Sequence, residues 1–266
     1  GAVILGVWGI LLGKRLPAWE RWARWAAALL PVSLWNMAVL FYLKIREAYF
    51  YDPNWERLQN IFAFSAGDPV YNHLNEGPVL CAIYGPVSVW AFWPAVFAQT
   101  PFGVLTIAAC LTVFYFFGPI FGLYTAGSFS RGLNEDQKKK SRMTAAFSII
   151  FFAAIALLSS SLRNAGFRIH ADAPALGLGA LACALLVLRR KDSVLGISMA
   201  ALAAVLSVWT KQVMVPLLAA MAVYLWAAEG NKVLRRYMGW VLFWGLFVSA
   251  LFICMFGAEP LFISMF

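Results

Sequence analysis

The chain has 266 residues, of which 62% are apolar and 12% are charged, and its formal net charge is +9. A mean hydropathy of +0.75 excludes an ordinary water-soluble domain, in which about half of the residues are apolar and about a quarter are charged. A lipid-exposed sheet would leave its edge amides without partners, and the sequence shows no regular alternation of polar and apolar residues. We therefore expect an all-α protein, a polytopic bundle of transmembrane helices.

Apolar runs mark the expected spans. Four runs are long enough to cross about 30 Å of hydrocarbon, and they occupy 25–43, 102–124, 143–161 and 238–256. Three shorter runs are separated by brief polar links and predict tightly turned helices at 173–188, 193–209 and 213–228. We treat 1–266 as a single transmembrane domain. Because the chain begins at Gly1 and ends just after a span, we expect it to be part of a longer protein.

The first outer loop covers 44–101 and begins with an aromatic and acidic string in which Asp52 precedes Pro53. Proline has no amide hydrogen to lose at the first position of a helix, and an aspartate before it can accept hydrogen bonds from the exposed amides. This pair predicts a helix from about 53 to 65. Asp52 is then either only a helix cap or a carboxylate that the cap holds rigidly at the membrane surface.

The predicted helix is amphipathic and ends at Gly67. Its apolar face recurs at three- and four-residue spacing and consists of Trp55, Leu58, Ile61, Phe62 and Ser65. The polar residues that lie largely off this face are Glu56, Arg57, Gln59 and Asn60. Such a helix is expected to lie along the membrane surface, so the outer loop carries interfacial helices.

The segment 79–100 decides which of the later loops share a side of the membrane. It contains prolines at 86 and 94 and several aromatic residues of the kind that gather at the headgroup level. We interpret it as an interfacial or re-entrant piece. If it crossed the membrane instead, every later loop would change sides.

With that assignment, Lys and Arg gather on one side. Fifteen of the 21 lie in the loops 14–24, 125–142, 189–192 and 229–237. The positive-inside rule makes this side cytoplasmic, so 125–142 is a cytoplasmic loop and 44–101 faces outside. The net charge is then a consequence of topology. We expect no nucleic-acid partner, because the basic residues lie in short loops without a folded basic face.

The second outer loop presents Arg163, Arg168, His170 and Asp172 within ten residues. Asp172 and Pro174 could simply start the next span. Ionisable residues near membrane depth are nevertheless functional candidates, because partners must offset their desolvation. These four side chains are therefore candidate site residues.

Lys211 lies in the brief link between two helices on the outer side. The positive-inside bias argues against a lysine that serves there only as a topology signal. A lysine whose stem lies along apolar surface while its ammonium reaches water is the competing interpretation.

Histidine and cysteine give little support for a metal site. His73 and His170 lie in different outer loops without the i, i+4 spacing of paired ligands, and the four cysteines have no paired spacing. We assign no metal ligands. A divalent metal stays open as a cofactor, because both histidines face the same compartment as the aspartates.

The order of these motifs resembles the GT-C membrane glycosyltransferases that use polyprenyl-phosphate sugars, especially the protein mannosyltransferase and lipid A aminoarabinose transferase branch. The resemblance covers roughly 25–228. It rests on four motifs on one side of the membrane: Asp52 followed by Ala66-Gly67-Asp68, Glu76-Gly77-Pro78 with Ile83-Tyr84-Gly85-Pro86, Ala171-Asp172-Ala173-Pro174, and Trp209-Thr210-Lys211-Gln212. The family's first motif usually has two adjacent acids, whereas Pro53 follows Asp52 here, and Glu56 one turn on is the candidate substitute.

The resemblance implies an inverting transfer of a sugar from a lipid-linked donor to an acceptor hydroxyl at the outer membrane face. Asp52 would take the acceptor's proton, a role worth about 10²–10⁴ in rate. Asp172, as the second catalytic carboxylate, would orient the acceptor, a basic residue or a metal. The departing phosphate would be bound by Lys211 with Arg163 or Arg168, and His170 would support the site.

A non-catalytic polytopic subunit or a transporter with a glycosyltransferase-like scaffold is the alternative. A transporter should show ionisable residues near mid-membrane and paired broken helices, whereas the charges here gather at the ends of spans. Lost catalysis agrees with the missing second acid. The expected partners are a lipid-linked sugar donor and membrane lipids, with membrane-protein subunits left open, and the expected location is the bacterial inner membrane.

Overall fold

The structure, a computed structural model, describes residues 38, 42, 52–73, 76, 83–128, 136, 168–189 and 193–265. All regular secondary structure in these residues is helical, as the composition predicts. The predicted spans 25–43 and 143–161 lie outside the described residues, apart from residues 38 and 42.

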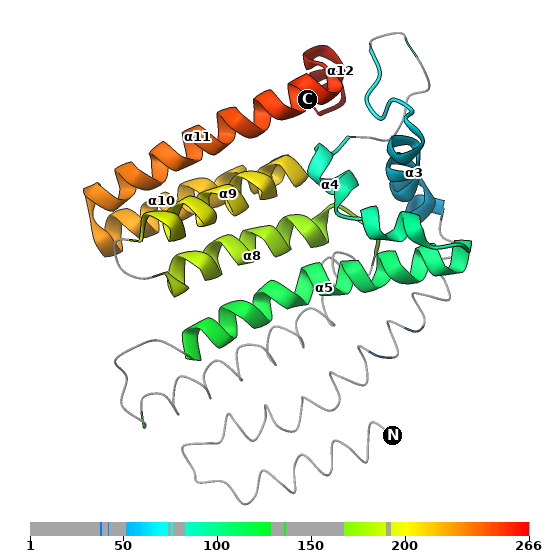
Figure 1. Ribbon diagram of the computed structural model, residues 1–266. Helices are drawn as coiled ribbons and strands as arrows, with labels where there is room; N and C mark the ends of the chain where they lie inside the picture. The colour runs from blue at the N-terminus through cyan, green and yellow to red at the C-terminus, as the bar shows by residue number, and fades with distance from the viewer. Residues whose placement is uncertain are drawn as a thin grey trace, which may run out of the picture.

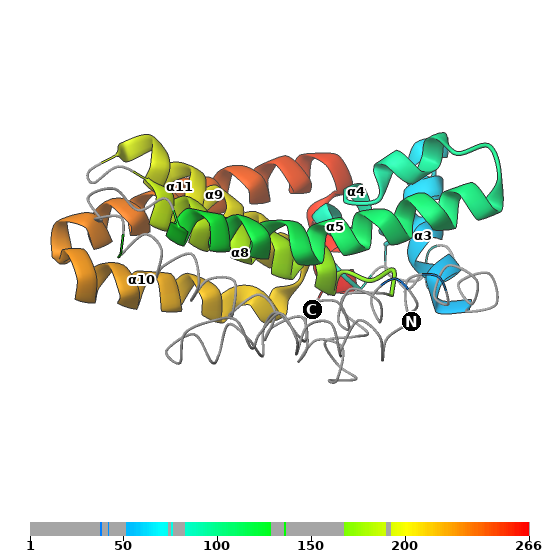
Figure 2. The same ribbon diagram turned by 90° about the horizontal axis from the view of Figure 1, so that it is seen from below.

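Five long helices of the described part run side by side (Figure 1). They are α5 (Pro101–Ser128), α8 (Asp172–Leu188), α9 (Val194–Thr210), α10 (Val215–Glu229) and α11 (Asn231–Phe256). Helix α8 packs between α5 and α9, and α11 packs against both α9 and α10. Because α8 and α10 begin at the end where α9 and α11 finish, the four helices from α8 to α11 alternate in direction, whereas α5 runs in the same direction as α8 (Figure 2).

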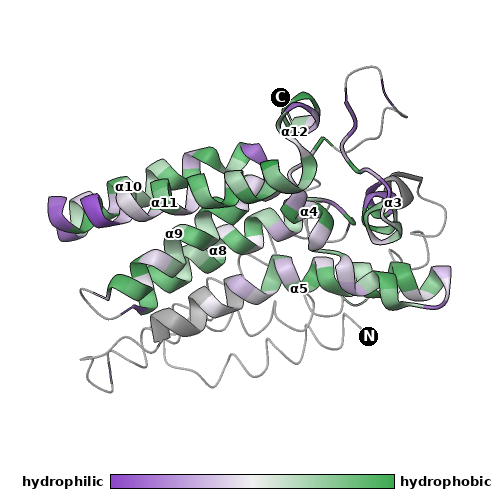
Figure 3. Cartoon of the chain, turned by 45° about the horizontal axis from the view of Figure 1, so that its top comes forward, coloured by the Kyte–Doolittle hydropathy of each residue, from purple (hydrophilic) through white to green (hydrophobic). Residues whose placement is uncertain are grey.

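Within the described residues, three helices are long and apolar enough to cross a membrane. They are the stretch Pro101–Pro119 of α5, the stretch Gln212–Glu229 that joins η3 (Gln212–Met214) to α10, and the whole of α11. Helices α8 and α9 are apolar but have only 17 residues each. Figure 3 shows hydrophobic residues along most of the length of these helices and strongly hydrophilic ones toward their ends.

The helix bounds agree with the apolar runs, with two differences. Helix α5 continues to Ser128 and so includes the start of the predicted loop 125–142, and α11 begins at Asn231, before the predicted start at 238. Hydropathy marks only the apolar part of a helix. The backbone hydrogen bonds continue through polar residues such as Lys232, which a helix accepts readily outside hydrocarbon.

Short helices gather at one end of the bundle, which we name the α3 end. They are α3 (Asp52–Ala66), α4 (Pro86–Trp90), η2 (Trp93–Phe97) and α12 (Ala258–Met265). Helices α4 and η2 contain all the helical residues described within 79–100, and at five residues each they are too short to cross a membrane. The described part of this segment therefore agrees with an interfacial or re-entrant piece.

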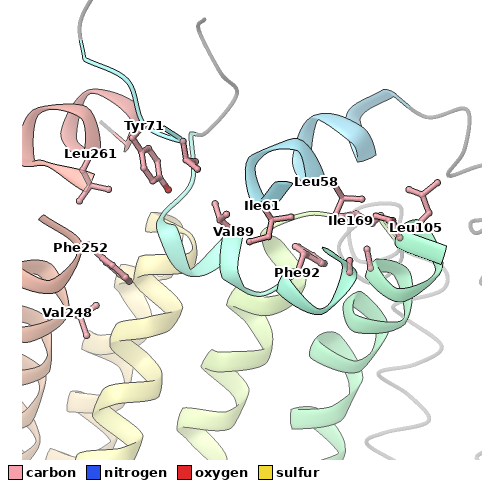
Figure 4. Packing of buried hydrophobic residues seen from close by; sticks show 14 of the residues in the cluster. Leu58, Ile61, Tyr71, Val89, Phe92, Leu105, Ile169, Val248, Phe252 and Leu261 are labelled. Carbon is pink, nitrogen blue, oxygen red and sulfur yellow. The ribbon is translucent and has the colours of Figure 1, made fainter. Parts of the chain in front are cut away.

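Helix α3 lies across the ends of the long helices (Figures 1 and 2). The predicted helix 53–65 is confirmed within one residue at each end, and Gly67 terminates it with a φ of 85°. Leu58 and Ile61 are fully buried and contribute to a core that also includes Phe92 of the segment between α4 and η2 (Figure 4).

The expected polar face of α3 is wrong at one position. Asn60 is only 5% exposed, although the helical pattern placed it off the apolar face. The reason is that α4 and η2 both pack against α3. Its buried face is therefore wider than that of a helix whose only apolar surroundings are lipid.

Small residues allow the long helices to approach one another closely, as is common between membrane helices. A Cβ atom at Gly177 of α8 would lie 2.2 Å from the carbonyl oxygen of Tyr115 in α5, so only glycine fits there. On the other side of α8, the Ser207 hydroxyl of α9 donates a hydrogen bond of 2.7 Å to the carbonyl oxygen of Ala175. These contacts fix α5, α8 and α9 as one layer.

An ion pair links the ends of α8 and α10 at the end of the bundle opposite to α3. Arg189, just after α8, donates to the carboxylate of Glu229 at the end of α10, and its side chain is 3% exposed. The predicted loops 189–192 and 229–237 therefore begin at the same end, opposite to α3.

We expect Gly177→Ala to destabilise the bundle by about 1–3 kcal/mol or more, because the added methyl group must push α5 away from α8. Thermal unfolding of the purified protein in detergent measures the loss. Gly239→Ala in α11 is the matched control, because a Cβ atom there meets nothing within 4 Å. Equal melting temperatures for the two variants would contradict the close approach.

Candidate functional site

Asp172 is the first residue of α8, as the sequence predicts for a residue that opens a span. The exposed amides and the positive end of the helix dipole favour a carboxylate at this position. The side chain is 32% exposed, so it is reachable from solvent and yet largely desolvated.

Lys211 follows the last residue of α9 in an extended conformation, with a φ of −153°. Its ammonium group donates a hydrogen bond to Oδ1 of Asp172. The lysine side chain is 22% exposed. The structure therefore brings together two of the predicted site residues, which are far apart in the sequence, in an ion pair between the end of α9 and the start of α8.

His170 contacts the other carboxylate oxygen of Asp172. Its Nδ1 atom lies 3.0 Å from Oδ2 of Asp172 and 3.3 Å from the backbone amide nitrogen of the same residue. One ring nitrogen cannot donate to the carboxylate and accept from the amide at once. The shorter contact and the negative charge favour the tautomer in which Nδ1 carries the proton and donates to Oδ2.

These partners set the charge of Asp172, which lies outside the three candidate spans. Burial alone raises the pKa of its carboxyl group, but hydrogen bonds from His170 and Lys211, together with the positive charge of Lys211, outweigh that effect and lower the pKa to about 2. Asp172 is therefore a carboxylate near neutral pH. It is suited to orienting a basic residue, which is one of the roles that the resemblance implies for it.

Tyr84 joins this cluster, and the sequence did not single it out as a site residue. Its hydroxyl lies 2.9 Å from Nε2 of His170, and the two rings meet edge to face. The guanidinium carbon of Arg57 and the ammonium nitrogen of Lys211 lie 4.8 and 5.3 Å from the centre of the tyrosine ring. Both distances are within the range of a cation–π interaction.

The position of Tyr84 depends on a close backbone approach. A Cβ atom on the next residue, Gly85, would lie 1.7 Å from the carbonyl oxygen of Trp209 in α9, so only glycine fits there. The hydroxyl of Tyr71 also donates a hydrogen bond of 2.7 Å to the carbonyl oxygen of Tyr84. The motif Tyr84-Gly85-Pro86 was the available sequence signal, but its contact with α9 is not visible in any local pattern.

A small recess lies beside Tyr84 under α3. It is lined by Arg57, Asn60, Tyr84, Ser88, Val89, Phe92 and Ala171. Oδ1 of Asn60 is buried and, within the described residues, has no hydrogen-bond partner. A buried acceptor without a donor is costly. This buried oxygen therefore lowers the stability of the α3 end.

The remaining predicted site residues are only partly placed. Asp52 and Glu56 belong to the first turns of α3, but their side chains lie outside the described part of the chain. Arg163 lies outside the described residues altogether. Arg168 lies in the turn before α8 and is half-buried.

The described residues contain no group of three or more His, Cys, Asp or Glu side chains that could hold a metal ion. His73 pairs instead with Glu259 of α12 at 2.9 Å. The chemistry of the described site is thus that of one carboxylate, one imidazole, one phenol and nearby cations.

No family model, curated protein or solved structure matches this chain.

We expect a double-mutant cycle of Lys211→Met and Asp172→Asn to show a coupling energy of about 0.5–3 kcal/mol in the free energy of unfolding. Both partners are largely buried, so either single change leaves the other charge without its partner. Denaturation of the purified protein in detergent measures the coupling.

The pair of His73 and Glu259 is the matched control. Its side chains are 54% and 57% exposed, and solvent-exposed pairs contribute little. Equal coupling energies for the two pairs would show that the contact between Lys211 and Asp172 is not a desolvated ion pair.

Proposed function

We propose that this chain is part of a membrane-embedded glycosyltransferase that moves a sugar from a polyprenyl-phosphate donor to an acceptor hydroxyl. One observation carries the proposal: Asp172, His170 and Lys211 meet at the α3 end of the bundle. The ends of spanning helices lie near the lipid headgroups, which is where the phosphate of a polyprenyl donor sits. The motif order described above supports the same reaction.

The proposed placement is a polytopic bundle in a bacterial inner membrane, with the α3 end outside the cytoplasm. The arrangement of charge supports this orientation. Lys232, Arg235 and Arg236 lie at the end of the bundle opposite to α3, where the positive-inside rule places basic residues.

Lys211 suits the donor phosphate even though it already binds Asp172. An ammonium group has three N–H donors, so a lysine can bind a carboxylate oxygen and a phosphate oxygen together. Arg168 lies in the turn before α8, close in sequence to Asp172, and Arg163 belongs to the same outer loop. In the proposed reaction these cations stabilise the charge that develops on the departing phosphate.

The acceptor hydroxyl needs a group that takes its proton. The resemblance gives this role to Asp52, the first residue of α3, with Glu56 one turn later as support. Helix α3 covers the same end of the bundle as Lys211, which supports an assignment of donor and acceptor to one site.

A non-catalytic subunit or a transporter remains the alternative function. The described charged cluster lies at helix ends, whereas a transporter needs ionisable groups near the middle of the membrane. The placement of the cluster therefore favours the transferase.

We expect Lys211→Met to lower sugar transfer by about 10²–10³-fold, because one charge-stabilising donor contributes on this scale. In the assay, radiolabelled polyprenyl-phosphate mannose or polyprenyl-phosphate aminoarabinose is added to membranes that contain the full-length protein. The measurement is the label that moves to membrane acceptors.

Lys232→Met is the control, because this exposed lysine lies at the opposite end of the bundle. We expect it to transfer at the parental rate. If the folded parental protein transfers neither sugar, the non-catalytic alternative is favoured. If Lys211→Met transfers as fast as the parent, the phosphate assignment is wrong.

A further inference from the structure

A chain of hydrogen bonds links Asp172 to the recess under α3. Oδ2 of Asp172 lies 3.0 Å from Nδ1 of His170, and Nε2 of His170 lies 2.9 Å from the hydroxyl of Tyr84. Tyr84 in turn lines the recess. A carboxylate, an imidazole and a hydroxyl in this order can move a proton from a ligand toward the imidazole.

The direction of the hydrogen bonds follows from the charge of Asp172. Its carboxylate accepts from Lys211 at one oxygen, so the other oxygen accepts from the Nδ1 hydrogen of His170. Nε2 of His170 is then an acceptor, and the hydroxyl of Tyr84 donates to it. The tyrosine oxygen keeps lone pairs that can accept a hydrogen bond from a bound hydroxyl group.

Two cations hold the ring of Tyr84 in place. The guanidinium carbon of Arg57 and the ammonium nitrogen of Lys211 lie 4.8 and 5.3 Å from the ring centre. The recess beside the ring is small, so an acceptor can place a hydroxyl group in it next to Tyr84 but not a whole sugar ring.

We infer that Tyr84, rather than Asp52, takes the proton of the acceptor hydroxyl, an inference that rests on the proposed function. As the acceptor oxygen bonds to the anomeric carbon, the bond from that carbon to the phosphate oxygen breaks, and its electron pair leaves with the phosphate. The acceptor's proton moves to the Tyr84 oxygen while the proton of Tyr84 moves to Nε2 of His170. The imidazolium that forms remains beside the carboxylate of Asp172.

The roles in this step are distinct. Tyr84 is the catalytic residue, because it touches the reacting hydroxyl. His170 and Asp172 are positioning residues that act through Tyr84, and Lys211 holds Asp172 in place. Asp52, the first residue of α3, then takes no part in the proton transfer.

Tyr84→Phe tests the inference, because it keeps the aromatic ring beside Arg57 and Lys211 and removes only the hydroxyl. We expect transfer of polyprenyl-phosphate mannose or aminoarabinose to fall by about 10²–10⁴-fold in kcat, with the KM for the donor within about twofold of the parent's. Tyr115→Phe is the control. Its hydroxyl donates to the carbonyl oxygen of Ala91 at 2.6 Å, outside the recess, and we expect the parental rate.

His170→Gln separates a proton-transfer role from a structural one. The glutamine side chain keeps a polar group beside Tyr84 but cannot take its proton, so we expect kcat to fall about as far as in Tyr84→Phe, with the KM for the donor within about twofold of the parent's. A parental kcat for Tyr84→Phe, together with a large loss in Asp52→Asn, would show that Asp52 takes the acceptor's proton, and this result would overturn the inference.

A second measurement keeps the inference testable if the parental protein transfers neither sugar, an outcome that contradicts the proposed function. The ¹⁵N spectrum of the histidine ring, assigned through His170→Gln, should show the tautomer with a protonated Nδ1 and an Nε2 signal that shifts in Tyr84→Phe. The opposite tautomer, or an Nε2 signal that does not respond to Tyr84→Phe, overturns the inference in either case.

Discussion

The ion pair between Lys211 and Asp172 joins the end of α9 to the start of α8, and the described site is arranged around it. Both side chains are largely withdrawn from water, so their hydrogen bonds must offset the lost hydration. Lys211 and His170 occupy the two oxygens of Asp172, which fixes the carboxylate and, through it, the imidazole. The imidazole then fixes the hydroxyl of Tyr84. A single pair of opposite charges thus orients a row of polar groups at the end of an apolar bundle.

Such a pair can form only where the helices lie close together. Glycine at position 177 lets α8 approach the backbone of α5, and Gly85 lets the segment before α4 reach the backbone of Trp209. Lipid is as apolar as the side chains, so burial of apolar surface does not drive helices together in a membrane. In the proposed membrane setting, close contacts between small residues and the polar pair at the helix ends supply that attraction instead. The packing and the site are therefore parts of one arrangement.

Local patterns predicted much of this fold but only part of the site. Helical bounds such as Asp172 at the start of α8 and Gly67 at the end of α3 follow from residues next to each other in the sequence. Charge counting also placed Asp172 and Lys211 on one side. Tyr84 and the burial of Asn60 depend on how α3 and α4 meet the long helices. That meeting is a long-range contact, which neither helical periodicity nor hydropathy encodes, so the hydroxyl beside His170 was missed.

The proposed orientation places the cluster around Lys211 outside the cytoplasm and the opposite end of the bundle inside. Single cysteines at two exposed positions, Asp68→Cys at the α3 end and Lys232→Cys at the far end, test it in intact cells. Both are made after replacement of the native Cys81, Cys110, Cys183 and Cys254. A membrane-impermeant maleimide should label Asp68→Cys directly and Lys232→Cys only after the cells are permeabilised. The reverse pattern, or labelling of both positions in intact cells, would contradict this orientation.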